Sequence, residues 1–295
     1  MAFQYLLYDV FTDAALTGNP LAVFTDAHDV PVAAMQRIAR ELNLSETTFV
    51  LPAERDDTDV RLRIFTPAVE LPMAGHPTIG STFALAKSGI IARGQTRFTF
   101  GLNVGPTPVE LQWDGDGVRF VWMSQSCPAF GRVVDGSVVA SSLGLTADDV
   151  RADLPAQEVS CGVPYLIAPL TDADAVARAV PDSAALRRLG EAIGGPRPVY
   201  LFADDPPRCL ARMFGPGLGV LEDPATGSAA GPLGGYLVQY AQRHGDDARR
   251  IVIHQGASMN RPSVLHVSID GDAGAIASVK VGGGAVLVGR GELYL

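Results

Sequence analysis

Two segments of the chain repeat one pattern, and each ends in a side chain that can take part in chemistry. The first runs from Arg63 to His76 and the second from Arg212 to Ser228. Both contain Arg, an apolar residue, Phe, any residue and Pro, and then, after a gap, Glu-x-Pro-x-x-Gly followed by His or Ser. Histidine transfers protons near neutral pH, and serine offers a hydroxyl group. The last position of each copy is therefore a candidate functional position.

The repeat extends beyond this pattern. The segment Gly18-Asn-Pro-Leu-Ala-Val23 matches Gly162-Val-Pro-Tyr-Leu-Ile167, and the three matched places are 144, 149 and 152 residues apart. Because the order is kept with small insertions, we interpret the chain as a duplicated domain. A duplicated domain of this kind usually places its functional site between its halves, so we expect the site there.

A helix is predicted directly after each candidate side chain, from Pro77 in the first copy and from Ala229 in the second. The first turn of a helix has unpaired N–H groups and a partial positive charge, so it binds carboxylates or phosphates without a basic side chain. The alternative for Ser228 is a purely structural N-cap. The candidate binding residues at the two helix starts are Gly75, His76, Pro77, Gly227, Ser228 and Ala229.

Two carboxylates are further candidates. Asp223 precedes a proline, which holds its backbone extended beside the second helix start. There it would contact a substrate amine or polarise His76, or it is only a turn residue. Glu46 opens a predicted strand, where it is either a solvated side chain or a proton shuttle, and spacing does not decide between them. Glu70 and Glu222 occupy equivalent positions, which favours a shared structural role.

Composition excludes several classes of function. The length of 295 residues suggests about two domains, and the net charge of −9 with no long basic cluster argues against nucleic-acid binding. Three scattered cysteines without close pairing indicate reduced thiols and a cytoplasmic location. No stretch approaches the roughly 18 apolar residues of a membrane span. No paired metal ligands are evident, so we expect no metal site.

The pattern of elements indicates two α+β halves joined by a hinge around residues 113–127. Each half has many strands and one central helix that is rich in small residues, which favours a barrel-like sheet wrapped around that helix. The predicted helices are 31–42, 77–88, 172–179, 183–193 and 229–243. The predicted strands are 4–11, 20–24, 47–51, 59–65, 95–112, 117–122, 163–168, 199–202, 210–214, 251–253, 263–269, 275–281 and 284–294.

These segments resemble the PhzF family of phenazine-biosynthesis isomerases. The resemblance is carried by residues 35–50, by both copies of the repeated pattern and by the Gly-Ser-Ala-Ala-Gly-Pro run that ends at Pro232. It extends from Asp9 to Glu292. It implies the diaminopimelate epimerase-like fold, in which two pseudo-symmetric domains enclose the active site in the cleft between them. The implied domains are 1–117 with the C-terminal strand of about 284–295, and 118–283.

The resemblance also implies a reaction and a set of roles. Glu46 would be the general acid–base, while His76, Asp223 and Ser228 would bind and orient a small carboxylated substrate, with Asp223 acting alongside His76. The reaction would be the isomerisation of trans-2,3-dihydro-3-hydroxyanthranilate, in which Glu46 moves a proton from C3 to C1 with no metal or organic cofactor. A homodimer is also implied.

Two other functions stay open. One is an epimerase or dehydratase of the same fold that acts on an amino or hydroxy acid, and the other is a small-molecule-binding protein that has lost activity. Epimerases of this fold place a cysteine at the start of each central helix. Since His76 and Ser228 occupy those positions here, a two-thiol mechanism is excluded by residue type.

Overall fold

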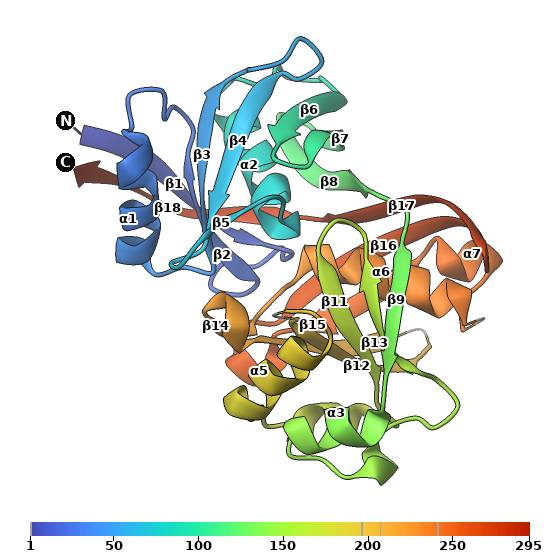
Figure 1. The fold of residues 1–295 in the computed structure, drawn as a ribbon. Coiled ribbons are helices and arrows are strands. Elements are labelled where there is room, and N and C mark those ends of the chain that lie inside the picture. Colours follow the sequence, from blue (N-terminus) through green and yellow to red (C-terminus); the bar gives the residue numbers. More distant parts are fainter. Residues whose placement is uncertain (1, 196, 207, 241) are drawn as a thin grey trace. The chain divides into compact units, whose positions relative to one another are not determined.

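The computed structural model describes residues 2–195, 197–206, 208–240 and 242–295. It divides into two compact units, the first formed by Met1–Ser124 with Val281–Leu295 and the second by Gln125–Lys280 (Figure 1). The resemblance implied a domain boundary between residues 117 and 118, which lies at the start of strand β8 (Gly117–Gln125). The division into units lies at the end of the same strand, after Ser124. The C-terminal strand β18 (Ala285–Tyr294) pairs antiparallel with the N-terminal strand β1 (Ala2–Val10).

The first unit is built on a sheet with one helix, α2, as its central element. Its helices are α1 (Val32–Leu42) and α2 (Gly75–Lys87). Besides β1, β8 and β18, its strands are β2 (Asn19–Phe24), β3 (Glu46–Pro52), β4 (Val60–Phe65), β5 (Glu70–Leu71), β6 (Arg97–Leu102) and β7 (Gly105–Asp114).

The second unit has its own central helix, α6. Its α-helices are α3 (Gly136–Ser142), α4 (Ala173–Arg178), α5 (Ser183–Ala192), α6 (Gly227–Gln239) and α7 (Gly245–Ala248). Its strands are β9 (Ala129–Val134), β10 (Ala156–Ser160), β11 (Pro164–Pro169), β12 (Val199–Asp205), β13 (Arg208–Gly215), β14 (Val220–Asp223), β15 (Ile251–Gln255), β16 (Ser263–Asp272) and most of β17 (Ala275–Gly283).

The strand pairings of the two units are the same. In the first, β1–β2 is antiparallel, β2–β3 is parallel, β3–β4 is antiparallel, and β4 then pairs antiparallel with β5 and parallel with β6. In the second, β10–β11, β11–β12, β12–β13, β13–β14 and β13–β15 follow the same directions in the same order. This repetition confirms the predicted α+β fold of two pseudo-symmetric halves.

Both central helices are enclosed by their surroundings. Eleven of the 13 residues of α2 and twelve of the 13 residues of α6 are buried. A Cβ atom on Gly80 would lie 2.6 Å from the side chain of Leu21, and one on Gly234 would lie 2.6 Å from the side chain of Val267. Real Cβ atoms do not approach that closely, so the small residues predicted to mark an enclosed helix are required by packing.

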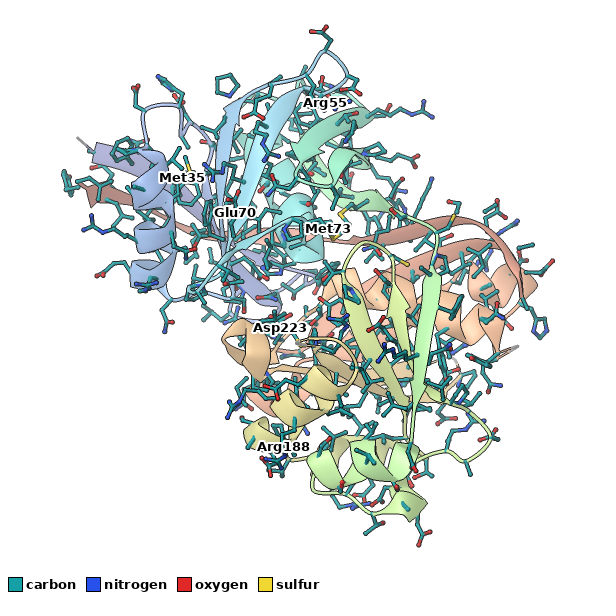
Figure 2. The ribbon with its side chains drawn as sticks, viewed as in Figure 1. Met35, Arg55, Glu70, Met73, Arg188 and Asp223 are labelled. Atoms are coloured by element: carbon teal, nitrogen blue, oxygen red, sulfur yellow. The ribbon has the colours of Figure 1, made fainter. Side chains whose placement is uncertain are left out.

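An arginine–glutamate pair stacked on a phenylalanine precedes each central helix, and we call it the Arg–Glu clamp. Arg63 donates through Nε and Nη2 to the Glu70 carboxylate at 2.9 and 2.7 Å, and its guanidinium lies 5.1 Å from the centre of the Phe65 ring. Such bidentate, stacked geometry is specific to arginine. Figure 2 shows Glu70 and Met73 on the segment that leads into α2. The predicted structural role of the glutamates is therefore confirmed.

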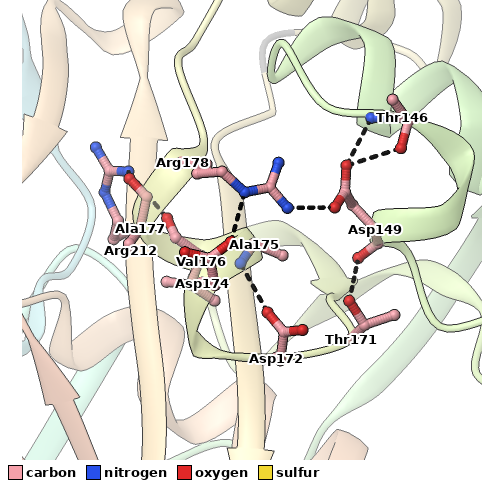
Figure 3. Close-up of polar contacts among 10 residues, drawn as sticks. All are labelled: Thr146, Asp149, Thr171, Asp172, Asp174, Ala175, Val176, Ala177, Arg178 and Arg212. Atoms are coloured by element: carbon pink, nitrogen blue, oxygen red, sulfur yellow. Dashed lines mark hydrogen bonds and ion pairs between the residues drawn. The ribbon is translucent and has the colours of Figure 1, made fainter.

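The clamp of the second unit has additional partners. Arg212 donates to both Glu222 oxygens at 2.8 and 3.0 Å and lies 4.7 Å from the Phe214 ring centre. Its Nη1 also donates to the carbonyl oxygens of Val176 and Ala177 at the C-terminal end of α4, which are drawn with Arg212 in Figure 3, and to that of Ala179, which follows the helix. These carbonyls have no partner within a helix that ends there, so Arg212 satisfies them.

The elements predicted from the sequence differ from those of the structure mainly at helix ends and in short elements. Both central helices begin two residues earlier than predicted, at Gly75 and Gly227, because the enclosing sheet overrides the low helix propensity of glycine. Helix α6 ends at Gln239 rather than Arg243, and position 241 lies outside the described residues. The strand predicted at 95–112 forms two strands, β6 and β7, which are separated by a turn before Gly105. The short elements that were not predicted are α3, α7, β5, β9, β10 and β14.

The second clamp predicts a stability difference. We expect Arg212→Lys to lower the free energy of unfolding by about 2 kcal/mol or more, because lysine cannot reproduce a partly buried bidentate bond and the carbonyl contacts. The matched control is Arg55→Lys, since Arg55 also binds a carboxylate, that of Asp57, but both side chains are more than half exposed. Its expected effect is much smaller, because an exposed ion pair contributes little to stability. Urea titrations measure both, and equal losses would contradict this account.

Candidate active site

The predicted site residues fall into two groups, one in each unit. Glu46, Gly75, His76 and Pro77 belong to the first unit, and Asp223, Gly227, Ser228 and Ala229 belong to the second. Each group gathers at the N-terminal end of a central helix. The expectation that both helix starts face one cleft stays a prediction.

Glu46 and His76 are brought together in the first unit. Glu46 is the first residue of β3, and His76 is the second residue of α2. Oε2 of Glu46 lies 3.3 Å from Nε2 of His76, and their side chains are 14% and 3% exposed. A carboxylate and an imidazole this close, with little access to water, can exchange or share a proton. A side chain that is 14% exposed does not fit the solvated alternative for Glu46, and its role as a proton shuttle stays a prediction.

Asn19, which we did not single out from the sequence, fixes the state of the histidine. Its Nδ2 lies 3.1 Å from Nδ1 of His76. In this orientation of the amide its nitrogen donates and Nδ1 accepts, which places the ring proton on Nε2, the nitrogen that lies 3.3 Å from Oε2 of Glu46. The one available signal was the position of Asn19 in the first copy of the repeat, where the second copy has Val163.

Burial keeps His76 uncharged. The histidine is fully enclosed, and the loss of solvent lowers its pKa from 6.5 to about 3. The bond from Asn19 acts in the same direction, because a charged imidazole would need both nitrogens as donors. His76 is therefore a neutral imidazole whose Nε2 lies in contact with the Glu46 carboxylate at 3.3 Å, without forming a hydrogen bond to it in this structure.

In the second unit, Asp223 and Ser228 have different partners. Asp223, labelled in Figure 2, is the last residue of β14 and is 5% exposed. It accepts a 2.6 Å hydrogen bond from Oγ1 of Thr226. Ser228 is the second residue of α6, and its Oγ lies 2.7 Å from the hydroxyl of Tyr165. The N-cap alternative for Ser228 is wrong, since the residue at the N-cap is Thr226. The action of Asp223 alongside His76 stays a prediction.

Strand register shows which functional positions differ between the copies. Phe65 and Phe214 occupy the same place in the two copies of the repeated pattern. Phe65 pairs with Thr47 on the neighbouring strand, and Phe214 pairs with Val199, so Thr47 and Val199 are equivalent positions. The residues that precede these partners are Glu46 and Pro198, so the counterpart of Glu46 is a proline. The counterpart of His76 is Ser228, so the contact between Glu46 and His76 has no equivalent in the second copy.

The remaining candidate features are metal ligands, cysteines and membrane-spanning helices. Among the residues that the structure describes, no group of three or more His, Cys, Asp or Glu side chains is placed to hold a metal ion. Cys127, Cys161 and Cys209 are free thiols, and the last two are buried. Within the same described ranges, no helix combines the length and the apolar character needed to cross a membrane.

The state of His76 predicts a pH-independent NMR signal. We expect ¹⁵N spectra to show an unprotonated Nδ1 and a protonated Nε2 that stay unchanged from about pH 8 to about pH 5, because the pKa lies near 3. Exposed His28 is the control: a hydrogen bond from its ring to Asp26 raises its pKa above the ordinary 6.5, so its ring should be protonated at pH 5, where that of His76 is not. Titration of His76 in this range, or a proton on Nδ1, would contradict the assignment.

The low pKa of His76 also determines the direction in which stability changes with pH. The folded state takes up a proton on His76 only near pH 3, whereas the unfolded chain does so near 6.5. The contribution of His76 to stability is therefore complete above 6.5 and is lost as the pH falls from there toward 3.

Comparisons with known proteins place the chain among relatives of this architecture. The family model described as phenazine biosynthesis-like protein matches residues 8–291. A trans-2,3-dihydro-3-hydroxyanthranilate isomerase from Pseudomonas fluorescens is 36% identical over 292 residues, with 99% of each chain covered. An uncharacterised isomerase from Mesorhizobium japonicum is 35% identical over 304 residues, also with 99% of each chain covered.

Solved structures agree. A PhzF-family protein from Bacillus anthracis superimposes with a TM-score of 0.87 at 27% identity over the whole of both chains. A hydroxyproline epimerase from Agrobacterium vitis gives 0.66 at 15% identity, covering 99% of this chain and 91% of that one, which shows a shared fold alone. These likenesses bear out the epimerase-like architecture. From the family match and the near-complete coverage of its relatives, we conclude that the chain belongs to the PhzF family and is an isomerase of the PhzF type.

Proposed function

We propose that the protein isomerises trans-2,3-dihydro-3-hydroxyanthranilate, or a small cyclic carboxylate of the same chemistry, with Glu46 as the single acid–base group. The observation that carries this proposal is the 3.3 Å contact between the Glu46 carboxylate and the buried imidazole of His76. The name of the Pseudomonas fluorescens relative supports the choice of substrate.

The pair suits a reversible proton transfer from carbon. A neutral His76 can donate to the Glu46 carboxylate without neutralising it, so Glu46 stays available as a base. Because the partial enclosure of Glu46 limits hydration, a proton that it takes up is retained long enough to be returned to the substrate. The contact is longer than a good hydrogen bond, as is common before substrate binds.

In the proposed reaction, ionised Glu46 removes the proton from C3 of the substrate. The C3–H bond breaks, an O–H bond forms on Glu46, and the electron pair shifts through the conjugated double bonds to C1. Glu46 then gives the proton to C1, which regenerates the carboxylate and leaves an enol that becomes a ketone. No atoms or electrons are gained or lost, so the step is proposed without a metal or organic cofactor.

The second unit and the helix starts would hold the substrate. We propose that Asp223 and Ser228 contact its polar groups, with the ionised Asp223 suited to an amino group. The first turns of α2 and α6, with Gly75, Pro77, Gly227 and Ala229, would offer backbone amides or close approach to its carboxylate. This division gives chemistry to the first unit and orientation mainly to the second.

A two-base epimerase is a poorer fit. Epimerisation by opposed groups needs a second proton carrier, but the counterparts of Glu46 and His76 are Pro198 and Ser228. An inactive binding protein would not need a carboxylate beside a histidine held in one tautomer. A homodimer and a cytoplasmic location remain part of the proposal. A light-scattering mass of 31.0 kDa, that of one chain, would contradict the proposed dimer.

The proposal predicts that Glu46→Gln abolishes the reaction. Glutamine keeps the shape but cannot carry the proton, so we expect kcat to fall by roughly 10²–10⁴-fold or more. In D₂O, the wild type should incorporate solvent deuterium into the reacting carbons and the variant should not, as followed by mass spectrometry. The matched control is Glu41→Gln, an exposed glutamate on α1, with turnover expected to be normal. Wild-type turnover by Glu46→Gln would refute the mechanism.

A further inference from the structure

Gln255, at the end of β15, is the centre of a buried hydrogen-bond network in the second unit. Its Nε2 donates to the backbone oxygen of Asp223 at 2.7 Å and to Oγ1 of Thr226 at 2.9 Å. Its Oε1 accepts from the Thr226 amide at 3.1 Å and from the Tyr200 hydroxyl at 3.0 Å. A glutamine amide has two N–H groups and two acceptor lone pairs, so all of them are used. Turning the amide over would set its oxygen against the Asp223 carbonyl and its nitrogen against the Thr226 N–H, so the two backbone contacts fix its orientation.

Thr226 transmits this fixed orientation to the Asp223 carboxylate. Because Oγ1 of Thr226 accepts from Gln255, its own single proton is directed to Oδ2 of Asp223, 2.6 Å away. Gln255, Thr226 and Asp223 are only 3%, 5% and 5% exposed. The network thus holds both the backbone and the carboxylate of Asp223, and it delivers a hydrogen bond that favours the ionised form.

The first unit builds the same loop without any of these polar groups. The repeated pattern matches Asp223 to Leu71 and Thr226 to Ala74. The parallel pairings β4–β6 and β13–β15 match Gln255 to Leu102, and each of these two residues ends its strand. Since the loop and central helix form with three apolar side chains in the first unit, this scaffold does not require the network. A buried polar network is also costly unless every group is satisfied.

We propose that Gln255 and Thr226 are positioning residues that hold the Asp223 carboxylate in the orientation and charge state needed to bind the substrate. This inference rests on the proposed function, in which Asp223 contacts the substrate. Neither residue touches the substrate, and Gln255 acts on the carboxylate only through Thr226 and through the Asp223 backbone.

The test uses substitutions taken from the first unit. Thr226→Ala and Gln255→Leu introduce the residue types found at Ala74 and Leu102. With trans-2,3-dihydro-3-hydroxyanthranilate as substrate, we expect each to lower kcat by roughly tenfold to a hundredfold, with a smaller change in KM. The acid side of the pH–rate profile should move to higher pH, because Asp223 loses a hydrogen bond to its charged form. Thr226→Ser, which keeps the hydroxyl, should restore both values.

Gln157→Leu controls for the loss of any buried glutamine in this unit. Gln157 is 8% exposed and bonds to the Gly131 carbonyl and the Tyr240 hydroxyl, which belong to neither group of site residues. We expect it to lower stability but to leave the pH–rate profile unchanged. An equal shift of the profile by Gln157→Leu, or wild-type kinetics in both Thr226→Ala and Gln255→Leu, would overturn the inference.

Asp223→Asn separates this inference from the proposed function. If Thr226 acts through the carboxylate, Thr226→Ala should have little further effect in an Asp223→Asn background. If Asp223→Asn impairs turnover but Thr226→Ala alone does not, only the positioning role fails. If Asp223→Asn has wild-type turnover, or the wild type neither converts this substrate nor binds 3-hydroxyanthranilate by calorimetry, the proposed function fails and the inference falls with it.

Discussion

The Arg–Glu clamp is the interaction on which the placement of each half of the site depends. A planar guanidinium binds both oxygens of a glutamate and stacks on a phenylalanine two residues along its own strand, once with Arg63 and once with Arg212. The clamped glutamate immediately precedes the loop that enters a central helix. Since that helix is enclosed on nearly all sides, fixing the loop also fixes the residues of the first helical turn. The two clamps therefore define where His76 and Ser228 lie within their units.

Function arises where the two copies differ. The clamp, the strand order and the enclosed helix are shared, but Glu46 is matched by Pro198 and His76 by Ser228. The second copy in turn has Asp223, Thr226 and Gln255 where the first has Leu71, Ala74 and Leu102. In the proposed mechanism, the first copy supplies the groups for proton transfer and the second supplies a polar network around a single carboxylate. This division is what we expect of a duplicated fold that uses one proton carrier rather than two.

The sequence predicted the parts of this arrangement that are encoded locally. Residue spacing alone predicted the duplication, the central helices, the equivalent glutamates of the clamps and the end of α1 before Asn43. The partners of the site residues were not, because they come from other strands: Asn19 from β2, Tyr165 from β11 and Gln255 from β15. A single buried amide or phenol side chain does not recur at a regular spacing, so no pattern in the sequence marks it as a partner. For the same reason the N-cap alternative for Ser228 was wrong, since tertiary contacts decided the role of its hydroxyl.

The central claim is that one carboxylate carries the proton between two carbons of the substrate. A single-turnover experiment with substrate deuterated at C3, in ordinary water, tests it most directly. If Glu46 both removes and returns the proton, part of the label should appear at C1 of the product in the first turnover, and less should appear as exchange with solvent has more time to occur. If C1 receives only solvent hydrogen even at the shortest times, while C3 loses its label, two separate groups carry the proton and the account is contradicted.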